Sequence, residues 1–321
     1  MRICVFGAGA VGGHIAARLA ATGHEVSVVA RGAHLEAMKR KGVKLIHGDE
    51  IISGNVRTGA SGVQDAVFVA LKANMLASFA DAAAPLLGPD TAVVFAQNGI
   101  PWWYAEDMES LDPERKLKNR IPRKNVVGGV VYSANEVVEP GVIRNFVPNN
   151  NMLVIGDADN RNPPRVAELR AALEQSGMSS PRPEDIRHAV WAKLVQNLGN
   201  SSLCLLTESS TSAVAGDASL KKLSERMKEE ATAIALAHGI DIKRAPPRPS
   251  GGHASGAIGH KPSMLQDYER GRPMEIESQL IAPLALARAA GVATPTLDMV
   301  VPLAAHKAAS KGLYEHRRAT L

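Results

Sequence analysis

The most constraining feature of this 321-residue chain is a glycine-rich turn that begins at residue 7. An apolar run at residues 3–6 leads into G-x-G-x-x-G at residues 7–12, and a helix-compatible stretch follows at residues 14–20. Strand, glycine turn and helix in this order are typical of the first β-turn-α unit of a dinucleotide-binding fold. The predicted phosphate-binding turn consists of Gly7, Ala8, Gly9, Ala10, Val11 and Gly12.

The three glycines of this turn have separate physical tasks. Gly7 permits the tight turn, Gly9 lets the backbone approach a pyrophosphate, and Gly12 allows the helix to pack closely against the strand. The N-terminus of the helix adds positive potential for a phosphate. Because glycine turns also recur by chance, the flanking strands and helix carry the prediction of a bound nucleotide cofactor.

The second predicted strand, at residues 25–30, indicates which cofactor is bound. An NAD site uses Asp or Glu about 20 residues past the glycines to bind the ribose 2′-hydroxyl. No acid stands at this position, and the strand is followed by Arg31, whose guanidinium suits a 2′-phosphate. We therefore predict NADP rather than NAD. The alternative is that Arg31 is a solvated residue at a strand end.

Composition places the chain among ordinary globular proteins with more than one domain. Hydrophobic residues make up 45% and charged residues 21% of the chain, which carries a net charge of +5. The positive charge is scattered except at residues 115–124, which lack interleaved aromatic residues. We interpret this stretch as solvated surface rather than a nucleic-acid site, and the basic balance as suited to an anionic cofactor and substrate.

The cysteines and histidines restrict the class of protein further. Cys4 and Cys204 are predicted to be buried thiols in a reducing compartment. The ten histidines form no H-x-x-H or Cys/His cluster, so we predict no metal site. No apolar stretch approaches the roughly 18 residues that span a bilayer. We expect a cytoplasmic protein whose partners include neither nucleic acid nor membrane.

The pattern of the chain changes near residue 180. Up to that point short apolar runs alternate with helix-like segments, which predicts a parallel α/β sheet. Its strands are expected at residues 3–6, 25–30, 66–71, 92–96, 126–132, 141–146 and 152–155. Beyond it, long helical patterns occupy residues 186–206, 218–238 and 274–290. We predict an α/β fold: a Rossmann-type dinucleotide-binding domain over residues 1–180 and an all-helical domain over residues 181–321.

One segment of the second half reads as a loop. Residues 244–261 are rich in proline, glycine and histidine. A mobile lid and an inert connector are both compatible with this composition.

Two polar residues follow strands of the predicted sheet. Ligands of a doubly wound sheet bind beyond the carboxyl ends of its strands. Lys72 follows the strand at 66–71, and Asn98 follows the strand at 92–96, with Gly99 allowing close approach of the backbone to a ligand. Each residue is a candidate for ligand binding, or else a loop residue that caps its strand.

Lys193, Asn197 and Asn200 share one stripe of the predicted helix at 186–206. Offsets of four and seven residues place them within about 60° of one another around the helix. The rest of this helix is largely apolar, and burial lowers the pKa of a lysine, as a catalytic acid near neutral pH requires. The alternative is a lysine whose head reaches solvent from a half-exposed helix.

A second helix start carries acidic residues. Pro273 suits the first turn of a helix, and Glu275 and Glu277 lie near its positive end. Without further observations they are helix-terminal charges with no catalytic part.

These motifs together resemble the ketopantoate reductase family (2-dehydropantoate 2-reductase) over essentially the whole chain. The glycine turn with Arg31 matches the family's cofactor turn, and Lys72 its lysine after the third-strand region. Four further signatures match: Gln97-Asn98-Gly99, the turn Glu139-Pro140-Gly141, W-x-K-L-x-x-N at residues 191–197, and the P-S-M-x-Q-D segment at residues 262–267 followed by Glu275.

The resemblance implies NADPH-dependent reduction of 2-dehydropantoate to pantoate, a step of pantothenate biosynthesis. Lys193 would be the general acid that protonates the carbonyl oxygen as NADPH delivers hydride to the 2-oxo carbon. Glu275 would hold the substrate hydroxyl and help to position the lysine. The implied substrate-binding and cofactor-adjacent residues are Asn98, Asn197, Ser263 and Lys72. The helical domain would bind the substrate, and a homodimer is expected.

The chain departs from the family pattern in two places. Where the family continues its lysine helix as K-x-x-x-N-x-x-x-N-P-L-T-A, Ser201 replaces the second asparagine and no proline follows. Asn200, one residue earlier, is our candidate to replace that asparagine. The segment Trp102-Trp103-Tyr104 is also bulkier than the usual glycine-containing loop. Two alternatives stay open: a paralogous NADPH-dependent reductase of another small 2-oxo acid, and a nucleotide-binding regulatory protein without catalysis.

Overall fold

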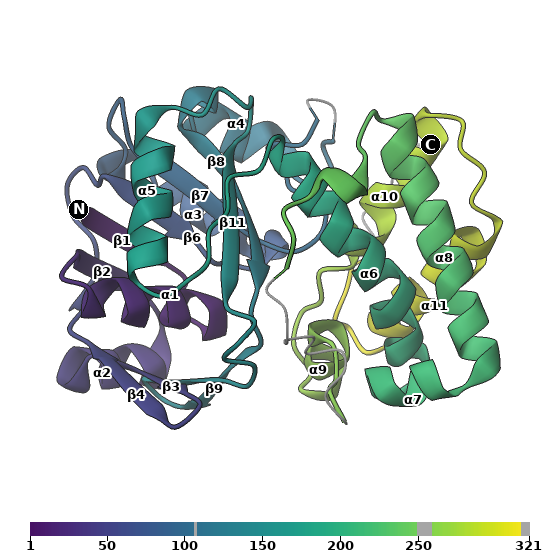
Figure 1. Cartoon of the computed structure of the whole chain (residues 1–321), viewed down its shortest axis with the longest axis horizontal. Helices are drawn as coiled ribbons and strands as arrows, with labels where there is room; N and C mark the ends of the chain where they lie inside the picture. The colour runs from purple at the N-terminus through teal and green to yellow at the C-terminus, as the bar shows by residue number, and fades with distance from the viewer. Residues whose placement is uncertain (106–107, 249–258, 316–321) are drawn as a thin grey trace. The chain divides into compact units, whose positions relative to one another are not determined.

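The computed structural model describes residues 1–105, 108–248 and 259–315 and divides the chain into two compact units (Figure 1). Unit 1 comprises Met1–Gln97, Arg115–Ile186 and Pro246–Ala254. Unit 2 comprises Asn98–Glu114, Arg187–Ala245 and Ser255–Leu321. The segment at residues 98–114, which follows a strand of the N-terminal half, therefore belongs with the C-terminal helices.

A seven-stranded sheet forms the centre of unit 1. In spatial order its strands are β11 (Met152–Asp157), β8 (Val126–Tyr132), β7 (Ala92–Ala96), β6 (Ala66–Val69), β1 (Arg2–Phe6), β2 (Glu25–Val29) and β5 (Arg57–Thr58). Neighbouring strands are parallel except β11, which is antiparallel to β8. The sheet follows the doubly wound pattern, because the chain starts in β1 and adds strands on both sides of it.

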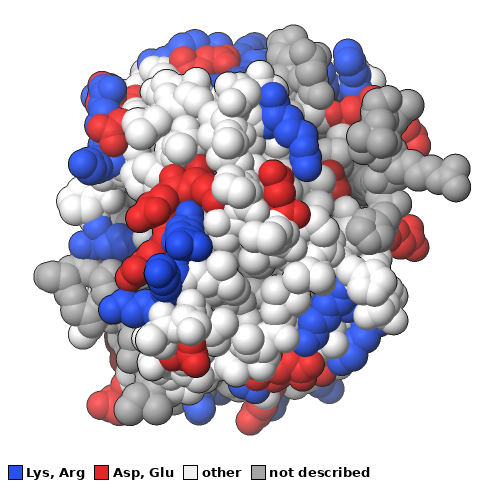
Figure 2. All heavy atoms as spheres, turned by 90° about the vertical axis from the view of Figure 1, so that its right-hand side faces the viewer, with Lys and Arg blue, Asp and Glu red and all other residues white. Residues whose placement is uncertain are grey.

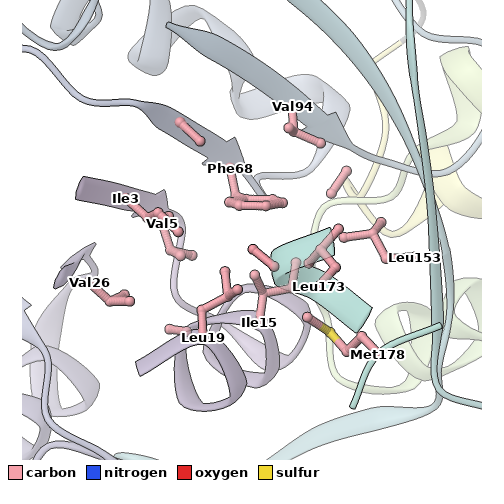
Figure 3. Close-up of a cluster of buried hydrophobic side chains, with 14 of the residues drawn as sticks. Ile3, Val5, Ile15, Leu19, Val26, Phe68, Val94, Leu153, Leu173 and Met178 are labelled. Carbon is pink, nitrogen blue, oxygen red and sulfur yellow. The ribbon is translucent and has the colours of Figure 1, made fainter. Parts of the chain in front are cut away.

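Apolar runs produce these strands because they are buried on both faces. Ile3, Cys4 and Val5 of β1 are fully buried, as expected for an inner parallel strand covered by helices. The covering helices of unit 1 are α1 (Ala10–Ala21), α2 (Gly32–Lys41), α3 (Leu76–Ala82), α4 (Lys116–Arg120) and α5 (Pro164–Gln175). Figure 3 shows one core of the unit, in which Ile3, Val5, Phe68 and Val94 of the sheet lie above Ile15 and Leu19 of α1 and Leu173 of α5.

A second, four-stranded sheet in unit 1 was not predicted. Its order is β4 (Glu50–Gly54), β3 (Val43–His47), β10 (Val142–Asn145) and β9 (Asn135–Glu139). The strand expected at residues 141–146 is β10, and it pairs with β3 and β9 rather than joining the main sheet beside β11. This sheet packs on α1: a Cβ added at Gly13 would lie 2.5 Å from Ile143 Cδ1.

All elements from residue 186 onward in the described part of the chain are helical, as predicted. They are α6 (Ile186–Thr207), α7 (Thr211–Gly216), α8 (Ala218–Ala237), a 3₁₀ turn (Ile242–Arg244), α9 (Ser263–Glu269), a π-helical turn (Glu277–Ile281), α10 (Ala282–Ala289) and α11 (Pro295–Ser310). The helix expected from residue 274 thus begins later and opens with the π-helical turn, a feature that is frequent at functional sites. Among the described helices none is long and apolar enough to cross a membrane.

Candidate functional site

The glycine turn has the tight geometry that its sequence predicts. Gly7 has φ +95°, and the backbone N–H groups of Gly7 and Ala8 both donate to the Val29 carbonyl at the end of β2, at 2.9 and 3.1 Å. A Cβ at Gly7 would lie 2.7 Å from Leu71 Cδ2 and 3.0 Å from the Ala70 carbonyl oxygen. At Gly12 a Cβ would collide with the Gly7 carbonyl oxygen. Both positions therefore require glycine.

The middle of this turn is open to an anion. A Cβ added at Gly9, the residue that caps α1, would have no atom within 4 Å beyond those of its immediate neighbours in the chain and of the adjoining helix backbone. The first turn of α1 contains no acidic residue, and the first N–H groups of a helix have no acceptor within the helix. The positive end of the helix and free backbone donors therefore coincide with open space, which suits a phosphate group.

The other cofactor candidates lie beyond strand ends of the same sheet. Arg31 is exposed and precedes α2, two residues after the carbonyl that holds the glycine turn. Lys72 is half-buried and directly follows Leu71, the residue that limits space at Gly7. Gln97 Nε2 donates to the Leu71 carbonyl at 3.0 Å, so the segments after β6 and β7 are joined.

In unit 2, α6 carries the predicted catalytic lysine. Lys193 and Asn197 lie one helical turn apart and are both half-buried. Asn197 Nδ2 donates to Gln279 Oε1 at 3.3 Å, and Gln279 is only 2% exposed within the π-helical turn. The Gln279 N–H in turn donates to the Glu275 carbonyl at 3.1 Å. Gln279, which the sequence pattern did not single out, thus links the backbone of Glu275 to the lysine helix.

The asparagine after β7 is held on the same π-helical turn. Gly99 has φ +82°, and the Ile100 N–H donates to the Ser278 carbonyl at 2.8 Å. The Ser278 hydroxyl donates to the Asn98 backbone carbonyl at 3.5 Å. The side-chain Oδ1 of Asn98 is buried with no hydrogen-bond partner among the described residues. A buried acceptor of this kind suits a ligand that donates a hydrogen bond. Unit 2 therefore gathers Asn98, Asn197 and Glu275 around one π-helical turn.

The bulky aromatic segment after Asn98 packs on the start of α6. Trp191 Nε1 donates to the Tyr104 hydroxyl at 2.7 Å, with the two rings edge to face. The Arg187 guanidinium lies 5.9 Å from the Trp103 ring centre and 5.7 Å from that of Tyr104. Trp103 is 2% exposed. The segment that departs from the family pattern therefore anchors its own loop to the tryptophan of the helix signature.

Two further candidates lie elsewhere in unit 2. Asn200 Oδ1 accepts a hydrogen bond from the Ser224 hydroxyl of α8 at 3.2 Å, which gives this side chain a role in helix packing. Ser201 beside it is buried, at 5% exposure. Ser263 is exposed at the first position of α9. The substrate contacts expected of Asn200 and Ser263 stay predictions.

The basic stretch and the two cysteines lie within the described part of the chain. The basic stretch at 115–124 is largely exposed, and Arg123 pairs with Asp159 at 2.8 Å. On the face shown in Figure 2, basic and acidic side chains lie in small mixed groups among uncharged surface.

Cys4 and Cys204 are free and buried, and burial raises the pKa of each thiol to about 11. No cluster of metal-binding side chains occurs among the described residues. The loop expected at residues 244–261 falls largely outside the described part, since residues 249–258 are not included.

A glycine turn at the carboxyl edge of a parallel sheet, followed by a helical unit with a lysine–asparagine face, defines a Rossmann-type oxidoreductase of the two-domain kind. The family model for ketopantoate reductase PanE/ApbA matches residues 3–160, and the model for the C-terminal region of the same family matches residues 185–308. The chain belongs to the ketopantoate reductase family and is an oxidoreductase that acts on a CH–OH group.

Individual relatives agree with this assignment. A 2-dehydropantoate 2-reductase of Mesorhizobium japonicum is 39% identical over 98% of this chain and 100% of its own length. A candidate ketopantoate reductase from Ralstonia solanacearum MolK2 has a TM-score of 0.86 at 33% identity, covering 98% of this chain and 99% of its own. A D-mandelate dehydrogenase solved with NADH and anilino(oxo)acetate has a TM-score of 0.81 over 98% of this chain and 100% of its own. At 20% identity that last likeness shows the fold alone.

Proposed function

We propose that the protein reduces 2-dehydropantoate to pantoate with NADPH and that Lys193 is the general acid. The observation that carries this proposal is the set of contacts around the π-helical turn. The Asn197 side chain bonds to Gln279, the backbone carbonyls of Asn98 and Glu275 accept from Ser278 and Gln279, and Lys193 lies one turn from Asn197 on α6. These are the residue types that a hydroxylated oxo acid requires, namely amides, a carboxylate and an ammonium. The 39% identity to a 2-dehydropantoate 2-reductase supports the same substrate.

The chain's own residues divide the work between binding and proton transfer. The open turn at Gly9 and the first N–H groups of α1 fit a pyrophosphate, and NADPH when bound supplies the hydride to the 2-oxo carbon. The Lys193 ammonium donates a proton to the carbonyl oxygen, on which negative charge builds as the hydride adds. The products are the 2-hydroxy acid and NADP⁺. Glu275 accepts a hydrogen bond from the substrate hydroxyl, while Asn98 and Asn197 orient the acid.

Replacement of Lys193 tests whether this residue is the general acid. We expect Lys193→Ala to lower kcat by about 10²–10⁴-fold, the usual loss for a general acid, with NADPH affinity unchanged. Lys222→Ala, which removes an exposed lysine of α8, is the matched control. Steady-state kinetics with NADPH and 2-dehydropantoate measure the effect, and near-normal kcat in Lys193→Ala would remove this residue from the role.

The choice of NADPH rests on Arg31. This exposed side chain follows β2, and no acid stands at the end of that strand to bind a ribose 2′-hydroxyl. We expect Arg31→Ala to weaken NADPH binding by about 1–3 kcal/mol and NADH binding much less, because a charge-assisted contact to the 2′-phosphate is lost. Titration of both nucleotides measures this, and equal losses would show that Arg31 does not bind the 2′-phosphate.

A second candidate substrate follows from the aromatic loop. Trp103 and Tyr104 pack beside Arg187 and Trp191, where the family has a smaller loop, so a paralogous reductase of another small 2-oxo acid is the runner-up function. Oxidation of NADPH across a panel of aliphatic and aromatic 2-oxo acids separates the two. The highest kcat/KM for an acid other than 2-dehydropantoate would favour the paralogue. Absence of turnover with every acid would favour the regulatory nucleotide-binding alternative.

The expected homodimer and the cytoplasmic location stay predictions. Three large apolar side chains of unit 2, Leu236 on α8 and Met299 and Leu303 on α11, are more than half exposed. Sedimentation of the purified protein measures the oligomeric state directly.

A further inference from the structure

His34 connects the glycine turn to the second sheet. It lies in the first turn of α2 and is half-buried. Its Nε2 lies 2.7 Å from the carbonyl oxygen of Ala8, in the middle of the glycine turn. Its Nδ1 lies 2.8 Å from the backbone nitrogen of Gly141, in the turn between β9 and β10. One imidazole therefore joins two backbone segments that are more than 130 residues apart in sequence.

The chemistry of the two partners fixes the state of the ring. A carbonyl oxygen only accepts a hydrogen bond, so Nε2 of His34 must carry the hydrogen. A backbone N–H only donates, so Nδ1 must be the acceptor for Gly141. The neutral imidazole with its hydrogen on Nε2 satisfies both bonds at once, whereas no apolar side chain makes either of them.

The Ala8–Gly9 peptide is held from both sides. Its carbonyl oxygen accepts from His34, and its N–H donates to the Gly7 carbonyl at 2.8 Å. Because the peptide unit is planar, these two bonds set the orientation of the plane that leads into α1 at Ala10. The direction of the N–H groups at the start of α1 depends on that plane.

The anchor on the other side, Gly141, is part of the second sheet. Gly141 has φ +82°, and its carbonyl accepts the Lys44 N–H of β3 at 2.9 Å, so the turn is built into the second sheet. A Cβ added at Gly141 would lie 3.2 Å from Ala37 Cβ of α2. The turn Glu139-Pro140-Gly141, which is not part of the proposed catalytic site, thereby supports the glycine turn through His34.

We propose that His34 is a positioning residue for the dinucleotide: it ties Ala8 to Gly141 and so holds the glycine turn in the shape that receives a pyrophosphate. This inference rests on the proposed function only in that unit 1 binds a dinucleotide. It assigns to the second sheet the task of supporting the cofactor turn. It also predicts that losing the His34 bonds weakens binding of ligands that contain a pyrophosphate and spares those that lack one.

Three replacements of His34 test its hydrogen bonds to Ala8 and to Gly141 separately. His34→Phe keeps a ring of similar size and removes both bonds. His34→Gln places an amide near the position of Nε2 and can restore the bond to Ala8, whereas His34→Asn places one near Nδ1 and can restore the bond to Gly141. His306→Phe, at an exposed histidine of α11, is the matched control.

The measurement is nucleotide affinity for each variant, by calorimetry or by fluorescence of the reduced nicotinamide. For His34→Phe we expect about tenfold weaker binding of NADPH, since a lost hydrogen bond is worth roughly one factor of ten, with partial recovery in His34→Gln. Binding of 2′-AMP, which has the 2′-phosphate and no pyrophosphate, should change less than twofold. In steady-state kinetics KM for NADPH should rise, while kcat and KM for the oxo acid stay constant.

Distinct outcomes would overturn the inference. Equal weakening of NADPH and 2′-AMP in His34→Phe would mean that the residue supports the fold of unit 1 in general. Unchanged NADPH affinity in a folded His34→Phe, as judged by circular dichroism and the unfolding midpoint, would mean that the turn keeps its shape without the bonds. If the unsubstituted protein binds neither NADPH nor NADH, the proposed function itself fails, and the inference fails with it.

Discussion

Gly99 offers a sharp test of how the Asn98 loop is held. Replacing it with alanine places a Cβ 2.5 Å from the Ser278 carbonyl oxygen, 2.6 Å from its carbon and 2.9 Å from the Gln279 nitrogen. All three are backbone atoms of the π-helical turn, so no flexible side chain can move aside. The residue also has φ +82°, in the region that costs an L-residue about 1–2 kcal/mol.

Two costs therefore add in Gly99→Ala. The first is the left-handed backbone itself. The second is the displacement of the loop, which breaks the 2.8 Å bond from the Ile100 N–H to the Ser278 carbonyl and leaves a buried donor unpaired, at about 1–3 kcal/mol. Gly291→Ala is the matched control, because Gly291 has φ +65° and an added Cβ there meets no atom within 4 Å. It carries the first cost alone.

Urea unfolding and steady-state kinetics on both variants separate the two costs. We expect Gly291→Ala to lose about 1 kcal/mol of unfolding free energy and to keep its kcat/KM. Gly99→Ala should lose at least about 1 kcal/mol more and show kcat/KM reduced about tenfold or more, because Asn98 moves away from the π-helical turn. Equal losses of stability in the two variants, with unchanged kcat/KM in Gly99→Ala, would refute the claim that this contact positions Asn98.

Two further predictions concern α6 and the buried histidine of α1. We expect Asn200→Ala to lower kcat/KM by about 1–3 kcal/mol in free-energy terms; a kinetically silent Asn200→Ala beside an impaired Ser201→Ala would assign the substrate contact to Ser201 instead. Burial lowers the pKa of His14 to about 3, whereas an unfolded histidine titrates near 6.5, so between these values the unfolded chain binds a proton that the native chain does not. Between pH 6.5 and 3, stability should therefore fall with decreasing pH by up to about 1.4 kcal/mol per unit. His14→Gln should remove this contribution from the slope of urea-unfolding free energy against pH, and an unchanged slope would contradict the assignment.

The main sheet could be predicted because its strands are uninterrupted apolar runs. The runs at residues 92–96 and 126–132 became β7 and β8 with the expected bounds, and every residue of both strands is buried. The second sheet was not predicted, because the side chains of its strands alternate between buried and exposed positions or are largely exposed. In β4, for example, Ile51 is 65% exposed and the strand begins with a glutamate. Such strands are stabilised by pairing with distant segments, which periodicity does not reveal.

The residues of the candidate site could also be predicted only in part. Lys72 and Asn98 could be placed because residues after parallel strands share one edge of a sheet, and Lys193 and Asn197 because helical spacing fixes a face. Gln279 was missed, since a π-helical turn leaves no pattern in an apolar helix.

His34 was missed for a related reason. It reads as one more residue of an amphipathic helix until the structure places Ala8 and Gly141 on either side of its ring. Contacts between segments far apart in sequence carry no local signal.

We expect the two departures from the family pattern to act independently, because the aromatic loop contacts α6 near its start whereas Ser201 lies near its end. Tyr104 bonds to Trp191, whereas Ser201 is ten residues further on, about 15 Å along the helix axis. Substitutions more than 7–10 Å apart with no shared partner combine additively. We therefore expect the effects of Tyr104→Phe and Ser201→Asn on kcat/KM for 2-dehydropantoate to add in the double variant within about 0.5 kcal/mol. A coupling energy above about 1 kcal/mol would show that the aromatic loop and the far half of α6 act on one substrate group. The two changes would then be a single adaptation to a different oxo acid.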